Sequence, residues 1–279
     1  SVSEITAYAF STEKPRRKRD ARERLEKISS VLLPDTITRI GEYAFSGCKG
    51  LREVNLPTMV RVIERGVFRG CESLREPLIP EGVTAIGDSA FEDCFSFESL
   101  TVPKGICSIG VSAFSGCLLL SKIDLPNTVL DIGDFSFSGD VNLTEARLQE
   151  GITSIGAYAF AFDKKLAKIT VPKSVTAIGD SAFLECENLT LSVYGGSYAE
   201  QYAKENGILG TTKENWIMKM HEGNLVLTGP LSIASREAFP NVATVSPKEF
   251  LLCAHVSQSV SSISTALQEE FIMYSPSSL

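Results

Sequence analysis

The sequence predicts a β-rich solenoid in which 23-residue coils, each with a short helical turn, stack on one another. The nine residues VTAIGDSAF occur identically at 83–91 and at 175–183, and these copies lie 92 residues apart, which is four times 23. Proline recurs at the same step from Pro34 to Pro172 without insertion or deletion, and columns of Ile and Phe keep phase with it. A single 23-residue unit cannot bury its own apolar face, but stacked copies can share one continuous core.

Two columns hold one residue type through seven consecutive coils, and we expect both to form the core. A third column is Pro with one exception, Gln149, and a fourth is Leu with one exception, Phe97. The members of the two invariant columns are Ile40, Ile63, Ile86, Ile109, Ile132, Ile155 and Ile178, and Phe45, Phe68, Phe91, Phe114, Phe137, Phe160 and Phe183.

Each coil contains three predicted elements. Residues 120–125 read Leu-x-x-Ile-x-Leu, which predicts a short strand in a parallel sheet on the concave face of the solenoid. The following proline ends that strand, because proline cannot donate to a ladder. Val-Thr-Ala-Ile predicts a second extended piece, which ends at Gly87 or Gly179. Asp-Ser-Ala-Phe is expected to form one helical turn, ended by a left-handed residue at Gly47, Gly70, Gly116 and Gly139.

The turn also carries a column of thiols, in which two of the seven places hold carboxyl groups. Its members are Cys48, Cys71, Cys94, Cys117, Asp140, Asp163 and Cys186. Thiols stacked about 4.8 Å apart could form disulfides or a metal ladder, or could simply fill the turn as small buried side chains. The two aspartates favour the second interpretation. We expect each to receive a backbone N–H, because an unpaired buried carboxylate is too costly.

We divide the chain into four segments. Residues 1–33 form a partial repeat with a basic insertion of 12 residues, and residues 34–194 form the regular repeats. Because the chain opens in the middle of a repeat, we expect repeat sequence upstream of it. Residues 195–210 form a helical capping segment, and residues 211–279 form a hairpin followed by degenerate repeats.

Short motifs predict the elements of the last two segments. Ser197-Tyr-Ala-Glu200 is a capping box, which predicts a helix over 198–206 that ends at Gly207. Residues 215–220 and 224–228 flank His-Glu-Gly, which predicts the hairpin.

The repeat unit LPxxVTxIGxxAFxGCxxLxxI, seen at 125–133 and at 109–117, resembles the leucine-rich repeats of the BspA-like family over about residues 34–194. The resemblance implies a leucine-rich-repeat solenoid. It also implies a protein that is surface-exposed or secreted, that acts in adhesion or ligand binding, and that has no shared catalytic site.

Composition and motifs favour a binding protein over an enzyme. The only histidines are His221 and His255, and the chain contains no nucleophile elbow, P-loop, zinc-protease or dinucleotide-binding motif. We therefore predict no catalytic residue, no cofactor and no metal. The formal net charge of −7 makes nucleic acid an improbable partner for the whole chain. No apolar run is long enough for a membrane helix, and no signal peptide is visible at Ser1.

The x positions of the first strand would form columns on the outer face of the sheet, where a solenoid commonly binds its ligand. These positions vary in charge while the core columns do not, as a recognition surface would, although any exposed strand position is free to vary. They contain no aromatic anchors, so we expect modest affinity per site and a contribution from avidity. The candidate binding residues are Glu53, Asn55, Glu76, Lys122, Asp124, Glu145, Arg147 and Lys168.

Three functions remain open. The first is a ligand-binding or adhesion module for a protein or glycan, such as one on a host surface or matrix. The second is a scaffolding segment of a larger protein. The third is a polyanion binder, because residues 13–27 hold eight Lys or Arg against four acids. That basic run could also be a nuclear-import-like tag or a processing site. It could equally be a charged loop leading into a short helix whose Leu25 and Ile28 rejoin the core.

Overall fold

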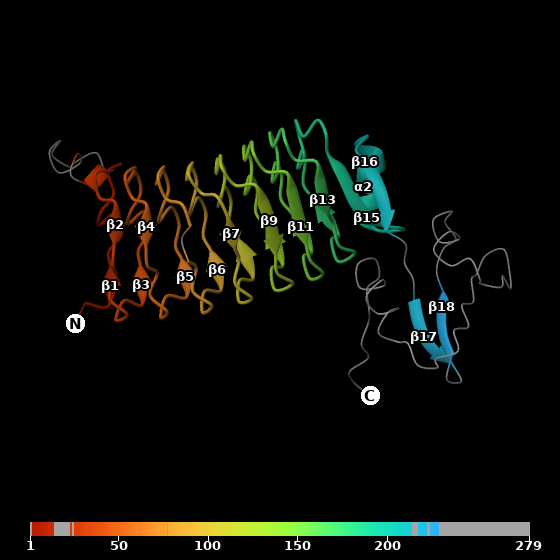
Figure 1. The fold of residues 1–279 in the computed structure, drawn as a ribbon, viewed down its shortest axis with the longest axis horizontal. Coiled ribbons are helices and arrows are strands. Elements are labelled where there is room, and N and C mark those ends of the chain that lie inside the picture. Colours follow the sequence, from red (N-terminus) through yellow and green to blue (C-terminus); the bar gives the residue numbers. More distant parts are fainter. Residues whose placement is uncertain are drawn as a thin grey trace. The chain divides into compact units, whose positions relative to one another are not determined.

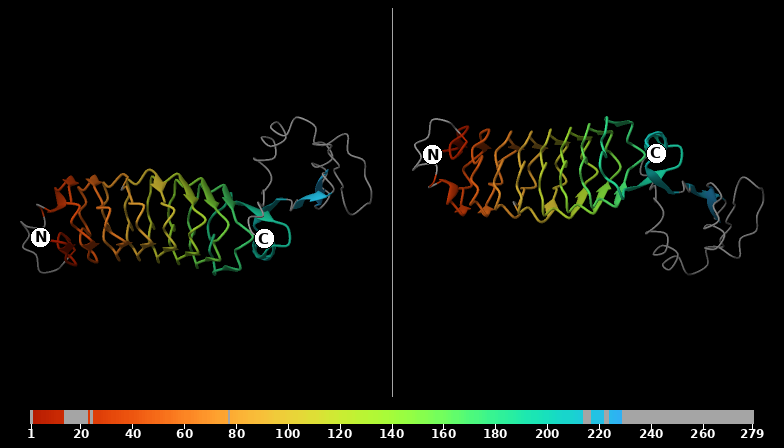
Figure 2. Two further views of the ribbon diagram at one scale, coloured as in Figure 1. Left: turned by 90° about the horizontal axis from the view of Figure 1, so that it is seen from below. Right: turned by 90° about the horizontal axis from the view of Figure 1, so that it is seen from above.

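The computed structural model describes residues 2–13, 23, 25–76, 78–213, 217–221 and 224–228. The chain divides into two compact units, Ser1–Thr212 and Lys213–Leu279. The first unit is a stack of coils, seen along its length in Figures 1 and 2. The second contains the predicted hairpin, in which β17 (Ile217–His221) pairs antiparallel with β18 (Asn224–Thr228). Most of the basic insertion and the expected degenerate repeats lie outside the described residues.

The predicted Leu-x-x-Ile-x-Leu strands form a six-stranded sheet in the described part of the chain. Its strands are β7 (Leu100–Thr101), β9 (Lys122–Leu125), β11 (Glu145–Leu148), β13 (Lys168–Thr170), β15 (Thr190–Tyr194) and β16 (Leu209–Lys213). From β7 to β15 the strands are parallel, and β9 pairs with β11 at a step of 23 residues. Upstream, β2 (Ser30–Val31) pairs in parallel with β4 (Glu53–Val54). The predicted 23-residue period is therefore confirmed as the register of a parallel sheet.

The second extended pieces form another six-stranded parallel sheet among the described residues. Its strands are β5 (Val62–Ile63), β6 (Ala85–Ile86), β8 (Ser108–Ile109), β10 (Asp131–Ile132), β12 (Ser154–Ile155) and β14 (Ala177–Ile178). At the start of the chain, β1 (Glu4–Ile5) pairs with β3 (Arg39–Ile40). This pairing joins residues 35 apart, so the first coil follows the same pattern despite its longer loop.

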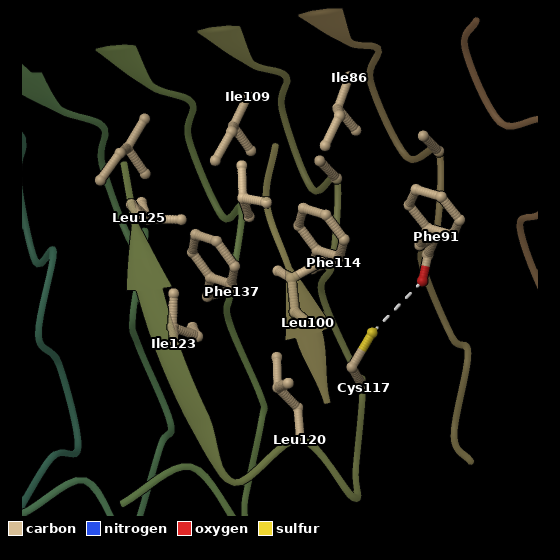
Figure 3. Packing of buried hydrophobic residues seen from close by; sticks show 14 of the residues in the cluster. Ile86, Phe91, Leu100, Ile109, Phe114, Cys117, Leu120, Ile123, Leu125 and Phe137 are labelled. Atoms are coloured by element: carbon tan, nitrogen blue, oxygen red, sulfur yellow. Dashed lines mark hydrogen bonds between the residues drawn. The ribbon is translucent and has the colours of Figure 1, made fainter. Parts of the chain in front are cut away.

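The core lies between the sheets and is built from the predicted columns. Successive rings from Phe45 to Phe183 stack with centroids 5.3–5.8 Å apart and interplanar angles of at most 15°. Figure 3 shows Phe91, Phe114 and Phe137 in one row, with Ile86 and Ile109 in another. Every member of both columns is buried. Each ring from Phe45 to Phe160 therefore has a stacked ring on both faces, which adds to the free energy of burying its apolar area.

The predicted helical turn is wrong in detail. In the coil at Gly87, the N–H groups of Ala90 and Glu92 donate three residues back, as in β-turns, but the N–H groups of Ser89 and Phe91 donate to carbonyls of the next coil. Ser89 has a left-handed φ of 52°, which a right-handed helix excludes. An α-helix would keep its backbone hydrogen bonds within the segment, whereas this turn uses every second one to join coils. The four cap glycines do have positive φ, between 68° and 80°.

Helix α2 (Tyr198–Glu205) covers the end of the stack. Ser197 Oγ accepts the N–H of Glu200 at 3.2 Å, as the capping box predicts, but the Glu200 carboxylate accepts from Gly196 N–H at 2.8 Å rather than from Ser197. The helix buries two alanines, and the ring of Tyr202 meets Phe183 edge-on at 6.0 Å. The last phenylalanine of the column is thereby shielded from water.

Removing one ring should weaken the whole stack. We expect Phe91→Ala to lower the free energy of unfolding by roughly 3 to 5 kcal/mol, because the residue is fully buried and the cavity cannot refill. Ile86→Asp should cost at least as much, because it buries an unpaired charge. Chemical denaturation measures both, with the exposed Lys122→Ala as the control. Unchanged unfolding midpoints in both core variants would contradict a shared core.

Two glycines allow the cost of a steric clash between coils to be compared with the cost of left-handed backbone strain. A Cβ at Gly133 would lie 2.6 Å from the carbonyl carbon of Gly110 in the preceding coil, so Gly133→Ala should force the coils apart. Gly139 has φ +80° but nothing within 4 Å of its Cβ position, so Gly139→Ala should cost only the left-handed conformation, about 1–2 kcal/mol. We expect the melting temperature to fall further for the first variant. The reverse order would show that coil spacing does not depend on the first glycine.

Candidate functional site

The structure brings most of the predicted binding residues together on the outer side of the first sheet. Lys122, Glu145 and Lys168 occupy equivalent places on β9, β11 and β13, and Asp124 and Arg147 are paired in the next column. Adjacent strands lie about 4.8 Å apart, which sets the separation of the side chains within a column. We call the surface formed by these five residues the sheet face. Glu53 and Glu76 lie further toward the N-terminus of the same side and are exposed.

Charges of opposite sign alternate on the sheet face. Lys122 Nζ lies 3.7 Å from the Glu145 carboxylate, and Asp124 accepts a hydrogen bond of 3.0 Å from Gln149 Nε2. The lysine and glutamate side chains are 72% and 43% exposed, so water screens the pair and it contributes little to stability. Within the described residues, no ion pair is recorded for Arg147 or Lys168. These charges can therefore meet a partner at little cost to the fold.

Asn55 differs from the other predicted residues, because its amide is bound within the protein. Its Oδ1 accepts the N–H of Leu33 at 2.6 Å, and its Nδ2 donates to the carbonyl of Leu33 at 2.8 Å. The side chain thus imitates a strand partner for the coil before it. The residues one coil before and one coil after Asn55 in its column are leucines, and both are exposed. Leu32 is 86% exposed and Leu78 is 75% exposed. The geometry supports a structural role for this residue.

The sequence reasoning missed a second surface, which we call the turn ridge. It consists of apolar residues of the turns that are 37–47% exposed. They are Val111, Leu119, Phe135, Val141, Phe162 and Leu184. The equivalent turns of the first coils carry charges instead, such as Arg69, which binds Glu92 at 2.8 Å and Glu13 at 3.3 Å. Exposed apolar side chains thus appear in the turns of the later coils, beside exposed charges such as Asp134 and Glu185.

Two phenylalanines of the turn ridge have unfavourable backbone conformations. Phe135 and Phe162 have φ values of 55° and 67°, in columns where Gly66 and Gly139 occupy the same left-handed region. Bulky residues are rare there, and each costs on the order of 1 kcal/mol. The backbone strain at Phe135 is partly offset by the stacking of its ring on Tyr158, with ring centroids 4.9 Å apart. The sequence could have indicated this surface, because Phe135 and Phe162 replace the small residues that most other coils have at the same places of the turn.

The thiol column fills the turns and takes part in no disulfide among the described residues. Each thiol lies near the carbonyl of a phenylalanine in the preceding coil, as Cys117 Sγ does with Phe91 O at 3.5 Å (Figure 3). Burial raises the pKa of Cys71, Cys94, Cys117 and Cys186, that of Cys186 to about 12, so these four thiols are neutral and poor nucleophiles. The predicted backbone partners of the aspartates are confirmed. Cys117 N–H donates to Asp140, and Asp140 N–H donates to Asp163.

No catalytic grouping emerges where the structure can be described. His221 ends strand β17, and His255 lies outside the described residues. In the described ranges no three His, Cys, Asp or Glu side chains gather as a metal site would require. Nor does any helix there have the length and apolar character of a membrane span.

Comparison with known proteins agrees with the repeat architecture. The model of the BspA type leucine rich repeat region matches residues 18–94 and 62–190, with six copies. No curated protein matches this sequence. The crystal structure of a leucine-rich repeat protein of T. pallidum aligns at 27% identity and a TM-score of 0.56, over 66% of this chain and 86% of that one.

A second solved structure is a leucine-rich cell surface protein from Faecalibacterium prausnitzii. It aligns at 21% identity and a TM-score of 0.33, over 72% of this chain and 85% of that one.

The turn ridge should tolerate the loss of its strained aromatic residue. We expect Phe162→Gly to change the free energy of unfolding by less than about 1 kcal/mol, because the relief of the left-handed strain offsets the lost apolar contact. Phe160→Ala, two residues away in the buried column, should cost roughly 3 to 5 kcal/mol. Urea denaturation compares the two. A similar loss in both variants would mean that Phe162 packs as core.

Proposed function

Because the chain belongs to the BspA type leucine-rich repeat family, we propose that it is a non-enzymatic module that binds a protein or glycan partner through an outer side of its solenoid. The observation that carries this proposal is the sheet face. Five exposed or half-exposed charged side chains lie there in two aligned columns, on strands whose inward residues are buried. The backbone under these side chains is held by ladders on both sides, so binding requires little ordering of the backbone.

The chemistry of the sheet face favours a polar partner. Lys122, Arg147 and Lys168 alternate with Asp124 and Glu145, so a partner with interleaved charges or hydroxyl groups would find complementary groups in register. Without an aromatic anchor, one such contact would be weak. Many copies displayed on a surface would raise the effective strength. This fits the surface-exposed or secreted location that the family resemblance implies, and we propose that location here.

The experiment is binding of the full, labelled chain to host cells, matrix proteins, immobilised glycans and heparin. The test variant is Lys122→Glu with Arg147→Glu, which inverts the charge at two of the three basic residues of the sheet face and leaves the core intact. The matched control is Lys104→Glu with Lys164→Glu. It makes the same change in net charge at exposed residues outside the two columns. We expect the test variant to lose at least about tenfold in affinity, while the control binds like the wild type.

Other outcomes point elsewhere. Binding that both variants retain but Phe162→Gly with Phe135→Ser loses would place the ligand on the turn ridge. Binding to heparin alone that falls steeply with salt would favour the basic insertion. Deletion of residues 14–22 tests that case and spares the contacts of Thr12 with Gly47 and of Glu13 with Ser46. Absence of any binding would favour a scaffolding segment.

A further inference from the structure

Cysteines of the thiol column perform two hydrogen-bonding tasks. The thiols of Cys71 and Cys94 lie 3.3 Å from the carbonyl oxygens of Phe45 and Phe68, each 26 residues earlier, to which they donate. The sulfurs of Cys71, Cys94, Cys117 and Cys186 also accept the backbone N–H of the column residue one coil earlier, as Cys94 does from Cys71. A thiol can be donor and acceptor at once, so each of these cysteines joins its coil to the one before it through both kinds of contact.

Asp140 and Asp163 occupy this column, where a side chain both donates and accepts a hydrogen bond. An ionised carboxylate can only accept. Their Oδ1 atoms accept the N–H groups of Cys117 and Asp140 at 2.7 and 2.8 Å. Their Oδ2 atoms are buried and make no hydrogen bond. An ionised carboxylate has no proton to donate, whereas a protonated one has an O–H in addition to an acceptor oxygen. Only the neutral acid can replace a thiol here.

The surroundings offer no compensating charge to this pair. Both carboxyl groups have 0% exposure. The ionisable groups bordering them in the described chain are each other and the thiols Cys117 and Cys186. The adjacent lysines, Lys164 and Lys165, are exposed, and Lys165 Nζ binds the side-chain oxygen of Asn142.

Both pKa values are accordingly high. Burial, followed by the neighbouring carboxyl group, raises the pKa of Asp140 well above its ordinary value. Burial raises the pKa of Asp163 to about 9, against the opposing effect of its backbone hydrogen bonds.

We propose that Asp140 and Asp163 form a proton-dependent latch between neighbouring coils, in which both side chains are neutral acids and their ionisation loosens the stack. Following the spacing of 26 residues that the thiols obey, the two O–H groups donate to the carbonyls of Phe114 and Phe137. Loss of the protons removes these donors and leaves two negative charges in adjacent coils of the core. The latch precedes β11 and β13 and therefore acts on the coils in the middle of the sheet.

The direction of the pH effect follows from the protons bound. A free aspartate has a pKa of about 3.9, so between about pH 4 and pH 9 the folded chain holds protons that the unfolded chain has released. Folding stability is then complete below about pH 4, with respect to these groups, and falls as the pH rises toward 9. Most buried carboxylates that are paired with cations give the opposite trend.

The test is denaturation of the full chain at a series of pH values, compared with Asp140→Asn and Asp163→Asn in one variant. An asparagine supplies one acceptor and one donor without titrating. We expect the unfolding constant of the wild type to rise between pH 5 and pH 9 by at least about a hundredfold more than that of the variant, since each retained proton contributes up to tenfold per pH unit. Asp124→Asn with Asp131→Asn, at exposed carboxyl groups, should keep the wild-type profile.

Carbon-13 titration of the aspartate carboxyl groups in the wild type gives an independent reading that requires no variant. Two carboxyl carbons should show the chemical shift of a protonated carboxyl group at pH 7. Both signals should be absent from the asparagine variant. Parallel pH profiles of wild type and asparagine variant would overturn the latch. So would aspartate signals that all titrate below pH 5, even if the variant failed to fold.

Discussion

The contact between one coil and the next is the constraint on which the rest of the repeat unit depends. A coil has too little apolar surface to fold alone, so it must place its phenylalanine ring against the rings on either side. That stacking, at 5.3–5.8 Å, goes with a close approach of the backbones at the glycine that follows five of the six strands of the second sheet, such as Gly110 and Gly133. In the second sheet the strands are only two residues long, yet they hold because the hydrogen bonds of the turns continue the ladder from coil to coil.

The same constraint explains which buried positions accept substitution. A phenylalanine position is filled by a ring that stacks on the rings of the neighbouring coils. A thiol position requires a small side chain with a donor and an acceptor, and a protonated carboxyl group also meets that requirement. Asp140 and Asp163 are therefore compatible with the stack. They make its stability depend on pH, whereas the cysteines, which stay neutral, do not. The interior of a repeat protein can in this way hold a condition-dependent element without interrupting its period.

The outer surface is where the coils differ, and the two sides described above differ from each other. The sheet face has mixed charges on a rigid backbone, whereas the turn ridge in the later coils has exposed aromatic and aliphatic side chains on strained turns. A polar ligand suits the first side, and an apolar contact suits the second. The regular core allows both sides to vary, because neither side contributes to the ring stack.

The sequence by itself determined the period, the core columns, the pairing register, helix α2 and the hairpin, because each follows from spacing and from local capping chemistry. It also predicted that Lys122, Glu145 and Lys168 would be neighbours, since strand register follows from the repeat. Only the tertiary structure decided the form of the turn, the hydrogen bonds of Asn55 to the backbone of Leu33, the exposure of Phe162 and the orphaned oxygens of the two aspartates. These depend on backbone φ and on contacts with the next coil, which lies 23 residues away and is not encoded in any local pattern.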